Sequence, residues 1–168
     1  MRLEIPRAIL VLATGLFLAT GLSGCVTSST GDTIKPLSAD RARDASIGDI
    51  VLVAKPDTVS AEFAGIFETR VREELAKCAT GSSPLRLNVR IIEMKGANAA
   101  MTVLVGDSNV IRGSAALVDP ATGEIVGDYE INQSTGGGGL IAAVSMGQAE
   151  EQMSRAFGKA LCDRAFAD

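Results

Sequence analysis

The spacing of hydrophobic residues along the chain predicts two amphipathic helices with a run of strands between them. From Phe63 to Cys78 the apolar residues recur at intervals of four and three, and charged residues occupy the positions off that row. Near the C-terminus, Met153, Phe157 and Leu161 repeat every four residues, opposite a charged face. Each pattern is that of a helix that buries one side and leaves the other in water.

Alternation with a period of two predicts the strands. Residues 85–91 (LRLNVRI) alternate apolar and polar side chains, which is typical of a strand with one wet face. Residues 49–56 (DIVLVAKP) form a short β-branched run ended by proline, and they predict a buried strand. Further strands are expected at 101–105, 109–119 and 124–133, with a hairpin turn at 119–123 (DPATG).

This order of elements predicts an α+β fold, a two-layer sandwich of the form β-α-β-β-β(-β)-α. The sheet is expected to be rich in antiparallel pairs, with two long helices on one face. If the strands at 85–91 and 124–133 pair with each other, Arg86 and Arg90 are expected to meet Asp128 and Glu130 on the wet face. We interpret such a cluster as solvated surface rather than as a site.

The N-terminus has the pattern of a secretory signal. Residues 1–7 (MRLEIPR) carry two arginines, and residues 8–22 (AILVLATGLFLATGL) carry no charge. A transmembrane anchor is the weaker interpretation, because a spanning helix needs about 20 strongly apolar residues. The apolar run here is shorter and is diluted by threonine and glycine.

The sequence Leu22-Ser23-Gly24-Cys25 resembles the lipobox of bacterial lipoproteins at every position. In that family the cysteine sulfur receives a diacylglycerol, the chain is cut before it, and the new amino group is acylated. The resemblance therefore implies that residues 1–24 are a lipoprotein signal peptide and that Cys25 is lipidated. Two or three acyl chains attach a protein to its bilayer durably. The alternative is an incidental Cys25 in an uncleaved or ordinarily cleaved signal.

The residue after Cys25 bears on the destination. It is Val26, not the aspartate that retains enterobacterial lipoproteins in the inner membrane. The resemblance favours the periplasmic side of the outer membrane, with the inner membrane as the alternative. Residues 25–46 lack hydrophobic periodicity and are predicted to be the acylated N-terminus and a flexible tether of about 25 Å. Residues 47–168 are predicted to form a single periplasmic domain.

Charge and composition argue against several classes of function. The chain has 16 basic and 20 acidic residues, so loss of Arg2, Arg7 and Glu4 with the signal leaves 14 and 19. Nucleic-acid binding needs a basic face and is not expected. The chain has no histidine, which excludes histidine triads, histidine bases and most zinc sites. We expect no enzyme, no metal and no cofactor.

Two cysteines remain once Cys25 is assigned to lipid. Cys78 and Cys162 each end a helix-like segment, and an even pair in an oxidising compartment favours a disulfide. If the two helices lie side by side in the same sense, their final turns would be joined. The alternative is two buried free thiols.

A glycine run precedes the last helix. It continues into apolar residues 140–144 (LIAAV), and it permits two interpretations: a loop entering a buried helix, or a mobile element that contacts the bilayer or another protein. The second makes the following residues candidates for partner binding: Gly136, Gly137, Gly138, Gly139, Leu140 and Ile141. The run also fits the G-x-G-x-x-A spacing of dinucleotide-binding proteins, but the second parallel strand that the fingerprint requires is missing, so nucleotide binding is not expected.

Residues 109–131 (NVIRGSAALVDPATGEIVGDYEI) resemble a hairpin pattern of bacterial envelope lipoproteins of unassigned function. The order of elements is loosely similar to the periplasmic α/β domains of CsgG and of the N-terminal part of TolB, without the segments that form the CsgG pore. We predict a membrane-anchored, non-catalytic module that docks an unidentified envelope protein. The alternative is a carrier or sensor of a small apolar ligand, which would need a cavity of more than a few hundred Å³ between sheet and helices.

Overall fold

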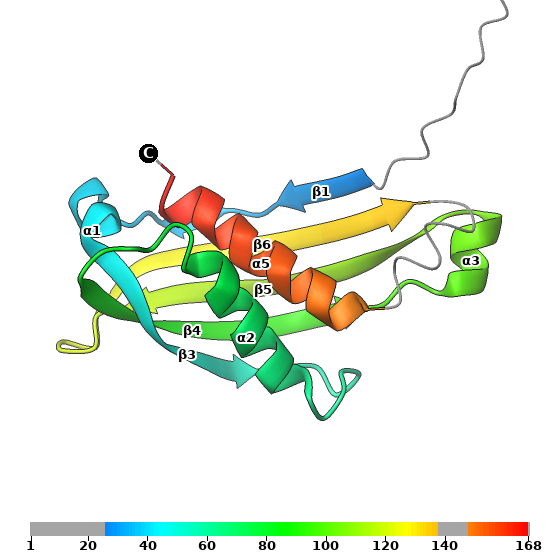
Figure 1. The fold of residues 1–168 in the computed structure, drawn as a ribbon, viewed down its shortest axis with the longest axis horizontal. Coiled ribbons are helices and arrows are strands. Elements are labelled where there is room, and N and C mark those ends of the chain that lie inside the picture. The colour runs from blue at the N-terminus through cyan, green and yellow to red at the C-terminus, as the bar shows by residue number, and fades with distance from the viewer. Residues whose placement is uncertain (1–25, 138–147, 168) are drawn as a thin grey trace, which may run out of the picture.

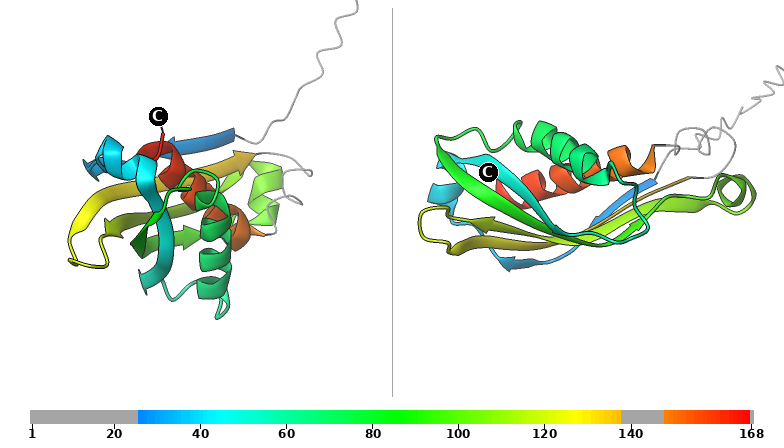
Figure 2. Two further views of the ribbon diagram at one scale, coloured as in Figure 1. Left: turned by 60° about the vertical axis from the view of Figure 1, so that its left-hand side comes forward. Right: turned by 90° about the horizontal axis from the view of Figure 1, so that it is seen from below.

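The computed structural model describes residues 26–137 and 148–167. They form two layers, a mostly antiparallel sheet and a pair of long helices on one of its faces, which confirms the predicted α+β class (Figures 1 and 2). The strands are β1 Val26–Thr30, β2 Thr33–Lys35, β3 Ala45–Ala54, β4 Ser83–Lys95, β5 Asp107–Val118 and β6 Ile125–Gly137. The described helices are α1 Ala39–Asp44, α2 Phe63–Leu75, α3 Ala99–Leu104 and α5 Ala149–Ala165.

The strands lie in the order β1-β6-β5-β4-β3, and β2 also pairs with β6. β3 runs parallel to β4, as expected for two strands joined through a helix, and the other pairs are antiparallel. The predicted hairpin between β5 and β6 is present. Its turn is closed by the N–H of Gly123, which donates to the carbonyl of Asp119 at 2.8 Å, and Gly123 adopts a positive φ of 73°.

The core lies between the sheet and the helices α2 and α5. The predicted inward faces of both helices are buried, and the ring of Phe67 meets that of Phe157 edge-on at 5.4 Å between centroids. The sheet contributes Leu85, Leu87, Val89, Ile91, Ile111, Ala115, Leu117, Tyr129 and Ile131, all buried. These side chains fill the space between the two layers, where a ligand carrier would need its cavity.

The predicted disulfide is present. Cys78 follows the end of α2, Cys162 lies near the end of α5, and their Cα atoms are 5.9 Å apart. The two helices lie side by side with their C-terminal ends at the same end of the pair (Figure 1). The bridge therefore joins the helical layer where both helices finish.

The prediction of a flexible tether over residues 25–46 is wrong for the part that is described. β1 and β2 pair with the outer edge of β6, from Val26 opposite Gly136 to Lys35 opposite Asp128. All eight residues of these two short strands are exposed. Backbone hydrogen bonds to a sheet edge hold them in place, and such bonds need no hydrophobic periodicity in the sequence.

Leu37 docks the N-terminal segment into the core. Its backbone N–H donates to the hydroxyl of Tyr129 at 2.8 Å, and both residues are buried. Burial raises the pKa of Tyr129, and the hydrogen bond from Leu37 opposes that effect. The tyrosine therefore stays protonated and joins the N-terminal segment to the middle of β6.

Replacing Tyr129 by phenylalanine tests this contact. The substitution removes one oxygen and leaves the N–H of Leu37 buried without its acceptor, so we expect a loss of about 1–3 kcal/mol in the free energy of unfolding. Urea unfolding measures it. An unchanged midpoint would show that Leu37 finds another acceptor or is not docked.

The predicted buried strand at residues 49–56 is instead the edge strand β3. Ile50 and Leu52 pack against the core, but Val51 and Val53 are exposed. A short β-branched run predicts burial on both faces only where elements cover both faces. Here the helices cover one face, so alternate side chains of β3 remain in water.

Residues 101–105, predicted as a strand, belong largely to the short helix α3. The side chain of Asn98 accepts from the N–H groups of Ala100 and Met101 at 3.0 and 3.1 Å and so caps the helix. Thr102, the one fully buried residue of α3, donates its hydroxyl to the carbonyl of Asn98. A cap and a buried side-chain bond outweigh the strand preference of Thr and Val, which is weak in isolation.

The expected meeting of Arg86 and Arg90 with Asp128 and Glu130 does not occur. β5 lies between β4 and β6, so that Arg90 is opposite Ser114, and Ser114 is opposite Glu130. Two strand spacings, about 10 Å in all, separate Arg90 from Glu130. The alternation placed these residues on the right face but could not give the strand order.

Candidate functional site on the open face of the sheet

The face of the sheet turned away from α2 and α5 is open to solvent within the described chain (Figure 2). Its side chains alternate with those of the core along β4, β5 and β6. Most are polar, but Ile92 of β4 is 68% exposed, and Val51 of the neighbouring strand β3 is exposed as well. An apolar side chain surrounded by polar groups is the arrangement found in many protein interfaces, so we take Ile92 as the candidate contact.

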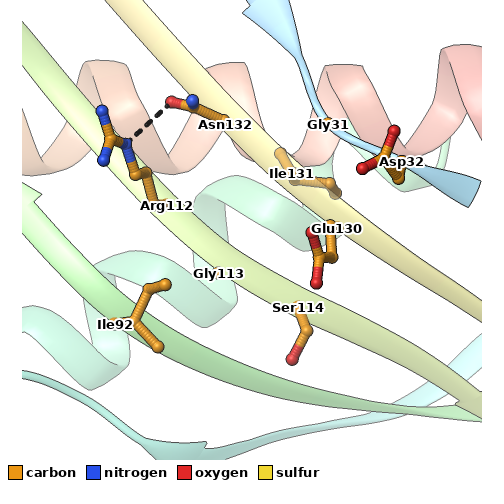
Figure 3. A pocket seen from close by; sticks show the side chains of 9 residues that line it. All are labelled: Gly31, Asp32, Ile92, Arg112, Gly113, Ser114, Glu130, Ile131 and Asn132. Carbon is orange, nitrogen blue, oxygen red and sulfur yellow. Dashed lines mark hydrogen bonds between the residues drawn. The ribbon is translucent and has the colours of Figure 1, made fainter. Parts of the chain in front are cut away.

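A hollow of about 440 Å³ lies beside Ile92 on this face. Its walls come from β4, β5, β6 and the Gly31–Asp32 turn that joins β1 to β2 (Figure 3). A second hollow of about 540 Å³ is lined by Ile92 and the residues that follow it, together with Pro56 and Thr58. Ile92 lines both hollows and therefore stands at the centre of the site.

Gly31 makes the first hollow by letting the chain turn tightly against β6. It has a φ of 130°, and a Cβ atom there would lie 2.1 Å from the carbonyl oxygen of Glu130. Next to it, the carbonyl of Asp32 accepts from the N–H of Glu130 at 2.8 Å. Only glycine permits this approach, because any other side chain would overlap the backbone of β6.

Replacing Gly31 by alanine is expected to detach β1 from the sheet while the core stays folded. Hydrogen exchange at the amides of Val26–Thr30 would then be much faster, and exchange in α5 would not change. Gly65 of α2 is the matched control, because a Cβ there meets nothing within 4 Å. Unchanged protection of β1 in the Gly31→Ala variant would contradict the tight turn.

The basic and acidic side chains that line the first hollow lie on opposite sides of it. The Arg112 Nε donates to Asn132 Oδ1 at 3.3 Å, and its guanidinium forms an ion pair of 3.3 Å with Glu93. Asp32 and Glu130 supply two carboxylates from the side of β6 and the turn (Figure 3). Exposed ion pairs contribute only about 0–1 kcal/mol to stability, so the pair orients Arg112 more than it stabilises the fold.

This arrangement has the composition of a protein-binding surface. Ile92 gives an apolar centre, and guanidinium, carboxylate and amide groups surround it as a polar rim, which is the anatomy of many protein interfaces. Arginine is enriched among the residues that dominate binding energy. Ile92 lines two hollows with room for side chains of a partner.

The structure places part of the predicted partner-binding run. Gly136 and Gly137 are not a flexible entry to a loop but the last residues of β6, paired with Ser108 and Asp107 of β5. Cys25, Gly138, Gly139, Leu140 and Ile141 lie outside the described residues.

No motif or periodic pattern in the sequence predicted a role for Gly31, Asp32 or Ile92. A signal existed for the last of these: Ile91 and Ile92 are adjacent in an alternating strand, so one of them had to face outward.

Comparisons with known proteins give only a general likeness of fold. No family model and no curated protein matches the chain. PelC of Paraburkholderia phytofirmans, solved as a dodecamer, has 12% identity and a TM-score of 0.45 over 84% of this chain and 100% of that one. A candidate lipoprotein of Caulobacter crescentus has 16% identity and a TM-score of 0.42 over 67% of this chain and 84% of that one. Likenesses this distant do not extend to function.

The described part of the chain contains no helix that is both long and apolar enough to cross a bilayer.

Proposed function

We propose that this protein is an envelope lipoprotein, held by an acylated Cys25 on the periplasmic side of the outer membrane, and that its domain is a non-catalytic binding module. The lipobox at residues 22–25, after a charged and then apolar leader, supports the anchor. Two or more acyl chains would keep the domain on its membrane.

The observation that carries the binding function is the exposure of Ile92, which lines the hollow on the open face of the sheet and also a second hollow beside Pro56 and Thr58. The partner is an envelope protein rather than a small molecule. An apolar centre surrounded by basic and acidic side chains is typical of surfaces that bind another protein, whereas small-molecule sites are mostly concave and enclosed. The packing of sheet and helix side chains in the described core, with Phe67 against Phe157, weighs against the alternative, a carrier of an apolar ligand between sheet and helices.

Labelled palmitate tests the anchor. The full chain, expressed in its cell, should incorporate the label, and the Cys25→Ala variant should not. The matched control is Cys78→Ala with Cys162→Ala, which removes the other two cysteines and should keep the label. Label that persists in Cys25→Ala would contradict the anchor.

Photo-crosslinking tests the docking surface separately. A photoreactive residue at position 92 of the acylated protein should give a discrete adduct with one envelope protein, and the same residue at position 159, on the outer side of α5, should not. The adduct should disappear when Arg112→Glu reverses the rim charge, while membrane attachment is unchanged. Equal adducts at both positions, or an adduct that survives the charge reversal, would contradict docking on this face.

A further inference from the structure

The start of β1 fixes where the lipid anchor leaves the domain. Val26 pairs with Gly136 of β6, and Gly136 pairs with Ser108 of β5, so Val26 lies about 10 Å from Ser108 across the sheet. Cys25 is bonded to Val26, and their Cα atoms are therefore about 3.8 Å apart. No tether separates an anchor at Cys25 from the sheet.

The helix α3 lies at the same end of the molecule. It immediately precedes β5, which begins at Asp107, and both figures place it at the end where β1 starts, opposite the β5–β6 turn (Figures 1 and 2). We call the exposed apolar residues of α3 and of its C-cap, Val105, the apolar tip: Met101 at 47% exposure, Val103 at 45%, Leu104 at 76% and Val105 at 73%. Residues 96–106 carry no charge.

A polar frame holds the apolar tip in this exposed position. Asp107 accepts from the Lys95 ammonium at 2.7 Å and from the N–H of Asn98 at 2.9 Å. The fully buried Asn109 accepts from the N–H of Ala97 at 2.7 Å. The hydrogen bonds from Lys95, Asn98 and Ser108 lower the pKa of Asp107 to about 2, so the frame stays charged at any physiological pH.

These hydrogen bonds thus hold four hydrophobic side chains outside the core. Several exposed apolar side chains gathered at one end of a folded domain are a candidate contact with something apolar. Val26, next to the anchoring cysteine, is also 70% exposed.

We propose that the apolar tip inserts into the interfacial region of the bilayer that holds the Cys25 lipid. This inference rests on the proposed anchor. Acyl chains attached one residue before β1 bring this end of the domain against the membrane, and apolar side chains there bury themselves about 5–10 Å into the boundary of headgroups and acyl chains. The Lys95–Asp107 pair lies at the base of the tip, where headgroups can solvate it. The open face of the sheet then stands side-on to the membrane.

Tryptophan fluorescence tests the insertion, because the chain has no tryptophan of its own. The acylated full chain with Leu104→Trp is reconstituted into phosphatidylcholine vesicles with brominated acyl chains. We expect blue-shifted emission that bromine quenches severalfold relative to unbrominated vesicles. Ala121→Trp is the matched control, because it lies in the β5–β6 turn at the far end of the sheet, and its emission should be red-shifted and unquenched.

The outcomes separate this inference from the anchor. If the protein does not float with the vesicles, the anchor at Cys25 is wrong, and the insertion falls with it. If it floats but emission from position 104 is unquenched, the anchor stands and the insertion is overturned. Hydrogen exchange on the unsubstituted protein guards against membrane affinity created by tryptophan itself: the amides of Thr102 and Val105 should exchange more slowly on vesicles than in Cys25→Ala. Equal rates would also overturn the insertion.

Discussion

Replacing Cys78 and Cys162 by serine is expected to lower the free energy of unfolding by about 4.5 kcal/mol in the loop-entropy model. The two residues are separated by 84 positions, so the bridge removes a large part of the freedom of the unfolded chain. Urea unfolding of the purified domain under oxidising conditions measures the loss. Serine is close to cysteine in size and both positions are half-buried, so the effect reports mainly the covalent link.

Reduction of the unsubstituted protein is the control. Dithiothreitol should lower its unfolding midpoint to that of the double variant and should not change the variant itself. If the reductant has no effect on the natural chain, the thiols are free in solution, and the stability argument for this bridge fails.

Truncation of Phe67 to alanine should cost about 3–5 kcal/mol, the usual range for a fully buried phenylalanine. Its ring touches those of Phe63 and Phe157 at centroid distances of 5.7 and 5.4 Å, and it therefore joins α2 to α5. Chemical denaturation measures the loss. Phe166, only partly buried at the end of α5, is the matched control and should cost clearly less when it is truncated. Equal losses at the two positions would contradict the assignment of Phe67 to the centre of the core.

Strong periodic signals were enough to predict the core of this fold. Phe63 to Leu75 and Met153 to Leu161 repeat with the helical period, and both rows are buried as expected. The alternation in residues 85–91 gave the strand and its wet face. The disulfide followed from two cysteines that each come at a helix end, since helices packed in the same sense bring those ends together.

The errors fall where long-range contacts decide the local structure. β1 and β2 carry no apolar pattern because they are held by backbone hydrogen bonds to β6. The side chains of these two strands therefore give no sign that they pair with a sheet edge. α3 has a strand-like composition but is capped by Asn98 and held by Asp107, which follows it in the chain. Which charged side chains are neighbours on the open face depends on β5 lying between β4 and β6. The alternation of residues within one strand does not specify that order.

The errors about β1 and about α3 concern the same end of the molecule. A tether would have let the domain stand clear of the membrane, whereas β1 holds residue 26 beside Gly136, and α3 exposes its apolar side chains nearby. The proposed orientation of the domain on the bilayer follows from this geometry together with a lipid on Cys25.

The mass of the N-terminal peptide of the protein, recovered from the membranes of its own cell, tests that lipid most directly. We predict a peptide that begins at Cys25 and carries a diacylglycerol on sulfur and an acyl group on nitrogen. A peptide that begins at Met1, or a Cys25 with an unmodified thiol, would contradict the account.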